Sequence, residues 1–219
     1  MLASDSAAAA IRPANLTGEF SITAEQAAVS RRSVRSYLPT PVSDEQIEEL
    51  LRLTGRAPSA FNVQPWRFVV VRDADLKEKL SAAAYGQKQL ISAPVVLALY
   101  SDMENALDTV EEIVNPALPA EKFAETLAML RRTFGGMTPE SRATWGNAQA
   151  NIALGYLLLL SKTLGLDTSP MLGFQPDQVK SLLGIPASAT ITALVALGHG
   201  AEEGFVSHRH QTSRIATFR

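Results

Sequence analysis

The stretch ALGYLLLLSKTLGLDTSPMLGF, residues 153–174, joins the most apolar segment of the chain to a loop that contains glycine. The apolar run begins at Ile152 and ends at Leu160, and polar residues flank it on both sides. A helix that crosses a membrane needs about 20 apolar residues, so this run is too short. We therefore expect a long helix buried in the core, followed by a loop over residues 167–174.

Strand and helix patterns alternate on the N-terminal side of this segment. Ser43 and Gln46 stand at capping-box spacing and begin a helix that Gly55 ends. Apolar runs rich in branched residues predict strands over 65–73 and 93–101. Between these runs, the spacing of leucines predicts another helix, over residues 75–90.

Helices dominate the second half of the chain. Residues 105–166 have a helical pattern that is interrupted at 115–119 and at 135–139 by proline and glycine. After the expected loop, a short helix over 176–184 and a third strand over 190–200 complete the pattern. This order predicts an α+β fold in which helices cover a small sheet.

Composition excludes several kinds of site. The chain has 219 residues, 46% of them hydrophobic, which suffices for one domain with a sizeable core. Lys and Arg total 20 against 22 for Asp and Glu, so the net charge of −2 gives no reason to expect nucleic acid or a membrane as a partner. The chain has no cysteine, which excludes disulfides and thiolate metal sites, and we expect a cytoplasmic protein.

The chain divides into a flexible N-terminal arm, residues 1–24, and a single domain, residues 25–219. The beginning of the arm lacks the basic region and the long apolar stretch of a signal peptide. No internal repeat is visible in the remainder.

Three polar stretches are candidates for ligand binding. RRSVRSY, residues 31–37, places arginines around a serine, which suits a phosphate dianion, although a solvated basic surface has the same pattern. APSAFNVQPWRF, residues 57–68, puts amides and hydroxyls at a strand entrance, where they can face a heterocycle or simply form a turn. SPMLGF, residues 169–174, can bring main-chain amides close to a flat ligand or merely connect two elements.

Together with GQKQLISAPVV, residues 86–96, and the opening stretch, these pieces resemble the nitroreductase family of FMN-dependent oxidoreductases. They occur in the family's order from Arg31 to the C-terminal tail. The resemblance implies an α+β sandwich with a small, mostly antiparallel sheet, a long buried central helix and an intertwined homodimer. It also implies FMN as the cofactor.

The resemblance assigns the basic stretch to the polar end of FMN. It implies that Arg31, Arg32 and Ser33 hold the phosphate and the ribityl chain. Arg35 matches a basic position near the pyrimidine edge of the flavin, where a cation favours the reduced ring. In the tail, Arg214 matches a basic position that relatives add to the phosphate site, whereas Arg209 is expected to be an exposed tail residue.

The other matched residues surround the flavin ring. A loop that in this family reaches the flavin bound mainly by the other subunit matches Pro58, Ser59, Ala60, Asn62 and Gln64. The side chain of Gln64 can instead hold this loop in place. Gln87 matches a polar position near the ring.

The loop over one ring face matches Pro170, Met171, Leu172 and Gly173. A main-chain N–H of Leu172 or Gly173 would then donate to flavin N5. Many relatives have an acidic residue where Leu172 stands, a change that a backbone contact tolerates.

The resemblance implies that NADH or NADPH reduces the flavin, after which a nitroaromatic or quinone-type acceptor takes the hydride in the same slot, a ping-pong scheme. The cofactor carries this chemistry, so we assign no catalytic side chain. One alternative is an FMN-binding or reservoir protein without turnover. Another is the same fold with other flavin chemistry, such as dehalogenation or flavin fragmentation.

Four further residues invite a functional interpretation. His208 and His210 lie close together, but without a carboxylate they are interpreted as a surface pair, so no metal is expected. Phe123 and Phe134 lie in the segment that should shape the acceptor pocket, and we interpret both as packing residues.

Overall fold

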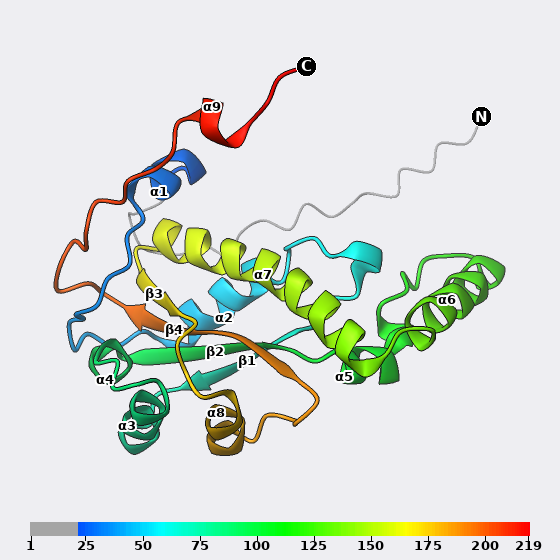
Figure 1. The fold of residues 1–219 in the computed structure, drawn as a ribbon, viewed down its shortest axis with the longest axis horizontal. Helices are drawn as coiled ribbons and strands as arrows, with labels where there is room; N and C mark the ends of the chain where they lie inside the picture. The colour runs from blue at the N-terminus through cyan, green and yellow to red at the C-terminus, as the bar shows by residue number, and fades with distance from the viewer. Residues whose placement is uncertain (1–21) are drawn as a thin grey trace, which may run out of the picture.

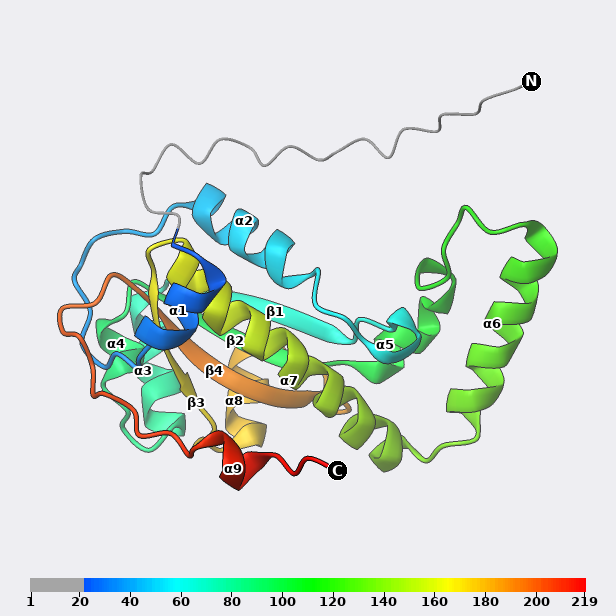
Figure 2. The same ribbon diagram turned by 90° about the horizontal axis from the view of Figure 1, so that it is seen from above.

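A four-stranded antiparallel sheet with the order β1-β2-β4-β3 organises the chain. This computed structural model describes residues 22–219, so most of the predicted arm over residues 1–24 lies outside the described residues. The strands are β1 (Trp66–Val71), β2 (Val95–Ser101), β3 (Asp167–Met171) and β4 (Thr190–Gly198). Strands β1 and β3 therefore form the two opposite edges of the sheet (Figure 2).

Helices cover both faces of the sheet (Figure 1). One face carries α1 (Ala24–Ser30), α2 (Asp44–Thr54) and α7 (Pro139–Thr163). The other face carries α3 (Ala74–Ala83), α4 (Gln89–Ser92) and α8 (Pro176–Leu183). This layering is the predicted α+β sandwich.

The remaining helices lie away from the sheet faces. Helix α5 (Met103–Asp108), the 3-10 turn η2 (Val110–Glu112) and α6 (Ala120–Gly135) form a lobe beyond one end of the sheet (Figure 2). The short helix η1 (Ala60–Asn62) precedes β1, and α9 (Thr212–Ile215) lies in the C-terminal tail.

Alternation along the central strands creates two cores. Val95 and Leu97 of β2 pack with residues of α2 and α7, whereas Val96 and Ala98 pack with residues of α3 and α8. All four side chains are fully buried. Because successive strand residues point to opposite faces, one continuous apolar run supplies both cores.

Helix α7 approaches the sheet closely because most residues of its buried face are small. This face consists of Gly146, Ala150, Ala153, Leu157 and Ser161. A methyl group built on Gly146 would lie 2.4 Å from Met103 Cγ and 2.5 Å from Ser101 Oγ. The expected burial of the central helix is confirmed along this face, while Ile152 and Tyr156 on α7 are each 40% exposed.

Most predicted elements are confirmed. The strands over 65–73 and 93–101 correspond to β1 and β2, and the breaks predicted at 115–119 and 135–139 separate the helices. The capping box of α2 forms, with Ser43 Oγ accepting from the Gln46 N–H at 3.2 Å. None of the helices within residues 22–219 is long and apolar enough to cross a membrane.

One prediction is wrong: residues 167–174 are not all loop. Asp167–Met171 forms β3, which pairs with β4, so the sheet has four strands rather than three. Pro170 is unusual within a strand, but β3 is an edge strand. A proline is tolerated there because its missing N–H is not needed on the open side.

We expect Gly146→Ala to destabilise the protein by up to about 2 kcal/mol. The added methyl group overpacks the contact of α7 with Ser101 of β2 and Met103 of α5, which costs about 1–3 kcal/mol. Alanine offsets about 1 kcal/mol of this cost, because it is favoured over glycine in a helix interior. Thermal or urea unfolding measures the change. Gly135→Ala, at the end of α6 with no atom within 4 Å of the new methyl group, is the matched control and should not destabilise. A Gly146→Ala protein as stable as wild type would contradict the close-packing argument.

Candidate functional site

Positive charge without a partner gathers where α1 ends. Arg31 is the C-cap residue of α1, and its Nη1 atom is buried with no hydrogen-bond partner among the described residues. Burial lowers the pKa of Arg31, and repulsion from Arg209 and Arg32 lowers it further. Three guanidinium groups therefore lie close together, an arrangement that an anion would stabilise.

Arg32 and Ser33 lie beside the start of β3. The Arg32 Nη1 group donates to the carbonyl oxygens of Val29, at 2.6 Å, and Arg31, at 2.9 Å, so this guanidinium is partly engaged with the end of α1. Ser33 forms a parallel bridge with Thr168 of β3. The hydroxyl oxygen of Thr168 is also buried without a partner among residues 22–219.

Arg35 is held through its backbone. Its main-chain N–H donates to Glu202 Oε1 at 2.8 Å, and its Nη1 group reaches the Ser33 carbonyl oxygen at 3.3 Å. The side chain is exposed and forms no ion pair shorter than 4.0 Å with the described acidic residues. Its charge is therefore available to a ligand.

The C-terminal tail crosses the arginine-rich segment. Gly204 has a φ of +70°, and a methyl group built on it would lie 2.9 Å from the Ser33 carbonyl oxygen. Arg209 is exposed, as expected, yet it is close enough to Arg31 to lower the pKa of that residue. Arg214 lies further along, exposed on α9, and is not among the charges that shift Arg31. Of the two tail arginines, Arg209 and not Arg214 is therefore near enough to Arg31 to repel its charge.

Gln87 and the loop after β3 meet at the other end of that strand. Gln87 Nε2 donates to the Gly173 carbonyl oxygen at 2.8 Å, and the ring of Tyr85 lies beside Gly173. Met171 is buried, whereas Leu172 is 73% exposed. Two segments that the sequence separates are therefore brought together, and their contact with the flavin ring stays a prediction.

Strand β3 separates these two groups by a definite distance. Thr168 lies beside the arginines, and Leu172 follows the end of the strand. At about 3.3 Å per strand residue, the four steps between them span about 13 Å. The strand can thus accommodate an elongated ligand with an anionic group at one end and a flat group at the other.

The loop over residues 58–65 is held by its own polar groups. Ser59 Oγ accepts from the Gln64 N–H at 3.0 Å, and Gln64 Nε2 donates to the Asn62 carbonyl oxygen at 3.2 Å. These bonds join Gln64 to other residues of its own loop, and its contact with the flavin stays a prediction. Pro58 and Ala60 are exposed at its beginning.

Backbone strain is confined to two loops. Among residues 22–219, the non-glycine residues with positive φ are Phe61 (+56°), Asn62 (+58°), Gln64 (+47°) and Tyr85 (+58°). The first three lie in the loop before β1, and the fourth lies beside Gly173. Strain of this kind costs about 1–3 kcal/mol per residue and is concentrated at functional sites.

The loop before β1 does not reach the arginines of the same chain. It leads into β1, while the arginines lie beside β3 on the opposite edge (Figure 2). Three strand spacings of about 4.8 Å put these edges about 14 Å apart. One chain therefore does not assemble all the predicted site residues.

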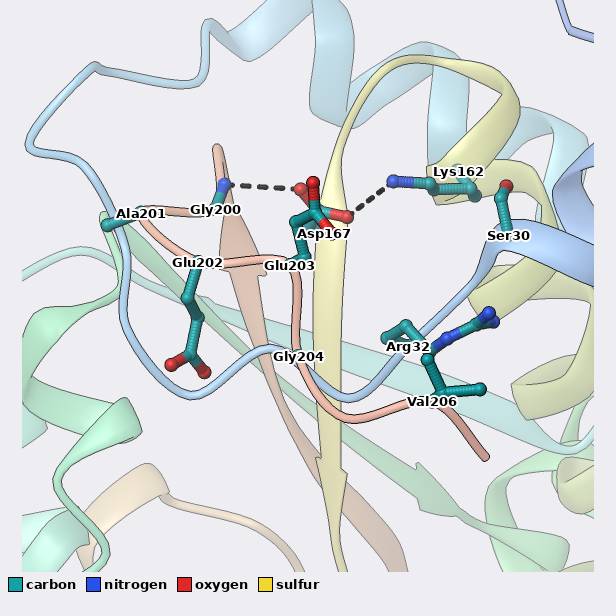
Figure 3. Close-up of a pocket in the computed structure, with 10 residues that line it drawn as sticks. All are labelled: Ser30, Arg32, Lys162, Asp167, Gly200, Ala201, Glu202, Glu203, Gly204 and Val206. Atoms are coloured by element: carbon teal, nitrogen blue, oxygen red, sulfur yellow. Dashed lines mark hydrogen bonds and ion pairs between the residues drawn. The ribbon is translucent and has the colours of Figure 1, made fainter. Parts of the chain in front are cut away.

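A cavity of about 630 Å³ adjoins the arginine end of β3 (Figure 3). It is lined by Ser30, Arg32, Lys162, Asp167, Gly200, Ala201, Glu202, Glu203, Gly204 and Val206. Lys162 Nζ contacts Asp167 Oδ1 at 2.7 Å, and the Gly200 N–H donates to Asp167 Oδ2 at 3.2 Å. Three carboxylates make this cavity a poorer receptor for an anion than the surroundings of Arg31, and it shares only Arg32 with the predicted site.

The paired histidines and the two phenylalanines lie in different surroundings. His208 and His210 are exposed with ring centroids 6.1 Å apart. Phe134 is buried and packs edge-on against Trp145, and Phe123 joins the same apolar cluster.

Sequence reasoning missed Phe61 and Tyr85. Phe61 is 49% exposed and lies edge-on to Phe134, and Tyr85 is 70% exposed. Phe61 stands next to Asn62 inside the motif over residues 57–68, and Tyr85 directly precedes the motif over residues 86–96, so these positions were the available signal.

Comparison with known proteins supports one family. The family model described as "Nitroreductase family" matches residues 28–199. The "NADH dehydrogenase" of Thermus thermophilus is 46% identical over 198 residues, which cover 90% of this chain and 97% of that protein. The "FMN reductase [NAD(P)H]" of Bacillus subtilis is 28% identical over 173 residues, 78% of this chain and 63% of the relative.

A solved structure has the same fold. It is a crystal structure of an Exiguobacterium sibiricum protein in complex with FMN. The TM-score is 0.85 at 25% sequence identity, with 93% of this chain and all of the other covered. The match of the family model over most of the chain, the relatives and the shared fold agree, and the chain belongs to the nitroreductase family.

Proposed function

We propose that this protein is an FMN-dependent oxidoreductase that uses NADH or NADPH to reduce nitroaromatic or quinone-type acceptors. The observation that carries the proposal is the pair of groups at the two ends of β3: uncompensated positive charge around Arg31, and the contact between Gln87 and Gly173. FMN has a phosphate at one end and a flat ring at the other. When bound, it supplies the hydride transfer in two half-reactions that share one slot.

The residues at the arginine end fit a phosphate group. Arg31 Nη1 and Thr168 Oγ1 are buried and without partners among the described residues, a costly state that a ligand would relieve. In the proposal Arg31, Ser33 and Arg209 hold the phosphate, with Arg32 contributing charge. Arg214 remains a second candidate from the tail.

The residues at the other end fit a flat ring. Leu172 and Gly173 are both exposed, and Gly173 has no side chain to cover its backbone, so a main-chain N–H of either residue can donate to the ring. Pro170 and Met171 position this loop, and Arg35 supplies a cation that stabilises the reduced cofactor.

Homodimerisation completes the proposed site. The strained loop, with Pro58, Ser59, Ala60 and Asn62, leads into the edge of the sheet opposite β3, about 14 Å across the sheet. The outer face of α7 exposes Ile152 and Tyr156. A symmetric pair of chains packed through these faces would bring each loop to the partner's ligand and cover the apolar residues.

Two features favour turnover over an FMN-binding protein without activity. Leu172 and Tyr85 are both strongly exposed at the ring end, so the described residues of one chain leave space for a second flat molecule there. The relatives' names, "NADH dehydrogenase" and "FMN reductase [NAD(P)H]", also describe reductases.

We expect the purified, FMN-loaded protein to lose its flavin absorbance under anaerobic conditions when NADH or NADPH is added. Absorbance should return when a quinone or a nitroaromatic follows, because the acceptor uses the slot that the nicotinamide has left. Stopped-flow absorbance with each donor measures the two steps separately. Bands that persist with both donors would support the alternative without turnover, and failure to bind FMN would reject the proposal.

In the same experiment, Arg35→Ala should bleach more slowly, because a cation beside the reduced ring is lost. Arg72→Ala removes a different surface arginine, one paired with Asp44, and is the matched control. An unchanged rate and an unchanged FMN affinity in Arg35→Ala would remove this residue from the proposed role.

Arg209→Ala should weaken FMN binding about fivefold, the effect expected for an exposed charge close to an anion. Arg214→Ala should weaken it less, because Arg214 lies further from Arg31 along the tail. Fluorescence titration at low and high salt measures both, and the difference should shrink at high salt as charges are screened. The reverse order would assign Arg214 to the phosphate.

Ile152→Glu combined with Tyr156→Glu should convert the proposed dimer to monomers, because two carboxylates would be buried without partners. Sedimentation velocity of the FMN-loaded protein measures the outcome. Leu118→Glu, which alters an exposed leucine in the lobe around α6, serves as the control and should stay dimeric. Wild-type protein that sediments as a monomer would reject the dimer.

A further inference from the structure

We propose that Gln89 is a positioning residue whose amide orients Gln87 and thereby fixes the Gly173 peptide of the ring loop. The proposal deepens the proposed function and rests on it, because Gly173 belongs to the loop that would hold the flavin. Neither the family motif nor the site predicted from the sequence assigns a role to Gln89.

Three hydrogen bonds connect these residues. Gln89 Nε2 donates to Gln87 Oε1 at 3.1 Å, and Gln87 Nε2 donates to the Gly173 carbonyl oxygen at 2.8 Å. The backbone of Gln87 is held as well, because its carbonyl oxygen accepts from Ser81 Oγ at 3.0 Å. Gln89 is only 8% exposed, so water competes little for its amide.

The Gly173 carbonyl oxygen determines the orientation of both side-chain amides. The Gly173 carbonyl oxygen can only accept, so Gln87 must present its NH₂ group to it. The oxygen of Gln87 then faces Gln89, which must in turn present its own NH₂ group. Reversing either amide would place two acceptors against each other.

Gln89 is held firmly enough to act in this way. It begins α4, a helix of only four residues that would not be stable alone. Leu90 is fully buried, and the nearly buried ammonium group of Lys77 donates to the Ala93 carbonyl oxygen at 2.8 Å, beyond the C-terminal end of α4. Both ends of the helix are therefore anchored to the α3 side of the sheet.

The ring loop needs such a restraint. Met171 is paired with Leu194 in the sheet and Gln175 donates its N–H to the Ala83 carbonyl oxygen at 2.8 Å, so the loop is fixed on either side of Leu172 and Gly173. Gly173 has no side chain to limit its backbone angles. Among the described residues, Gln87 is the one that donates to its carbonyl oxygen.

The test is Gln89→Glu, measured at pH 8 and at pH 5. At pH 8 the new carboxylate can only accept, so it attracts the NH₂ group of Gln87 away from Gly173. Burial raises the pKa of a carboxyl group. A protonated fraction at pH 5 can therefore donate to Gln87 Oε1 and restore the original direction.

We expect the FMN dissociation constant, relative to wild type at the same pH, to rise about tenfold at pH 8 and to return towards wild type at pH 5. Using the ratio removes the effect of pH on the FMN phosphate itself. Gln178→Glu is the matched control, because Gln178 forms an exposed amide–amide bond with Gln175 at 2.6 Å in α8. It should show no such dependence on pH.

A second readout needs no cofactor. In FMN-free protein, hydrogen exchange of a peptide covering residues 171–176 should be faster in Gln89→Glu than in wild type at pH 8, and the difference should disappear at pH 5. Gln87→Glu, which removes the donor to Gly173 directly, should show the faster exchange at pH 8. Gln87→Glu replaces Gln89→Glu in this experiment if the latter is too unstable to purify.

The outcomes separate this proposal from the proposed function. If Gln89→Glu impairs FMN affinity and loop protection equally at both pH values, Gln89 acts through packing. If exchange and FMN affinity of this variant match wild type at pH 8, Gln89 has no role. Either result overturns the inference. Failure of the wild-type protein to bind FMN would reject the proposed function, while the exchange experiment would still decide whether Gln89 orients the loop.

Discussion

The close approach of α7 to the sheet is the contact on which the rest of the structure depends. Gly146, Ala150 and Ala153 on its inner face allow the helix backbone to lie directly against the central strands. Small side chains let the backbones of the helix and the sheet come close together, so a larger side chain at these positions would displace the helix. The same helix has an apolar outer face, with Ile152 and Tyr156 exposed. A helix that is apolar on both faces needs a second partner.

The edge position of β3 gives the candidate site its length and access. An edge strand has one side free of sheet hydrogen bonds, and β3 carries the arginine segment at its start, through the bridge from Ser33 to Thr168. At its other end the chain leaves the sheet at Leu172, beside Gln87. A central strand would have been covered along both sides. The charge at one end and the amides at the other thus become accessible along one side of the protein.

The strained backbone angles of this protein lie in loops and not in its buried core. Nearly all residues of the central strands β2 and β4 are buried. In contrast, the positive-φ residues Phe61, Asn62, Gln64 and Tyr85 lie in two loops next to the proposed site. A rigid layered core can hold a few unfavourable backbone angles, since their cost of about 1–3 kcal/mol each is met by packing elsewhere. Loops held in this way present their polar groups in fixed directions, which lowers the entropy lost when a ligand binds.

Patterns local in the sequence determined most helices and strands. The capping box at Ser43 and the apolar runs of β1 and β2 could be identified from neighbouring residues alone, because caps and periodicity depend on nearby side chains. The motif around Arg31 by itself left an anion site and a solvated basic surface open, and the phosphate role came from the resemblance to the family. Strand β3 could not be identified in this way: its residues include Pro170, and only pairing with β4 and an edge position make them a strand. Likewise, only the tertiary structure brought Arg209 near Arg31 and joined Gln89 to Gly173 through Gln87. It also put the loop before β1 at the edge of the sheet opposite β3. Contacts between residues far apart in the sequence depend on how the helices and strands pack, and not on local sequence.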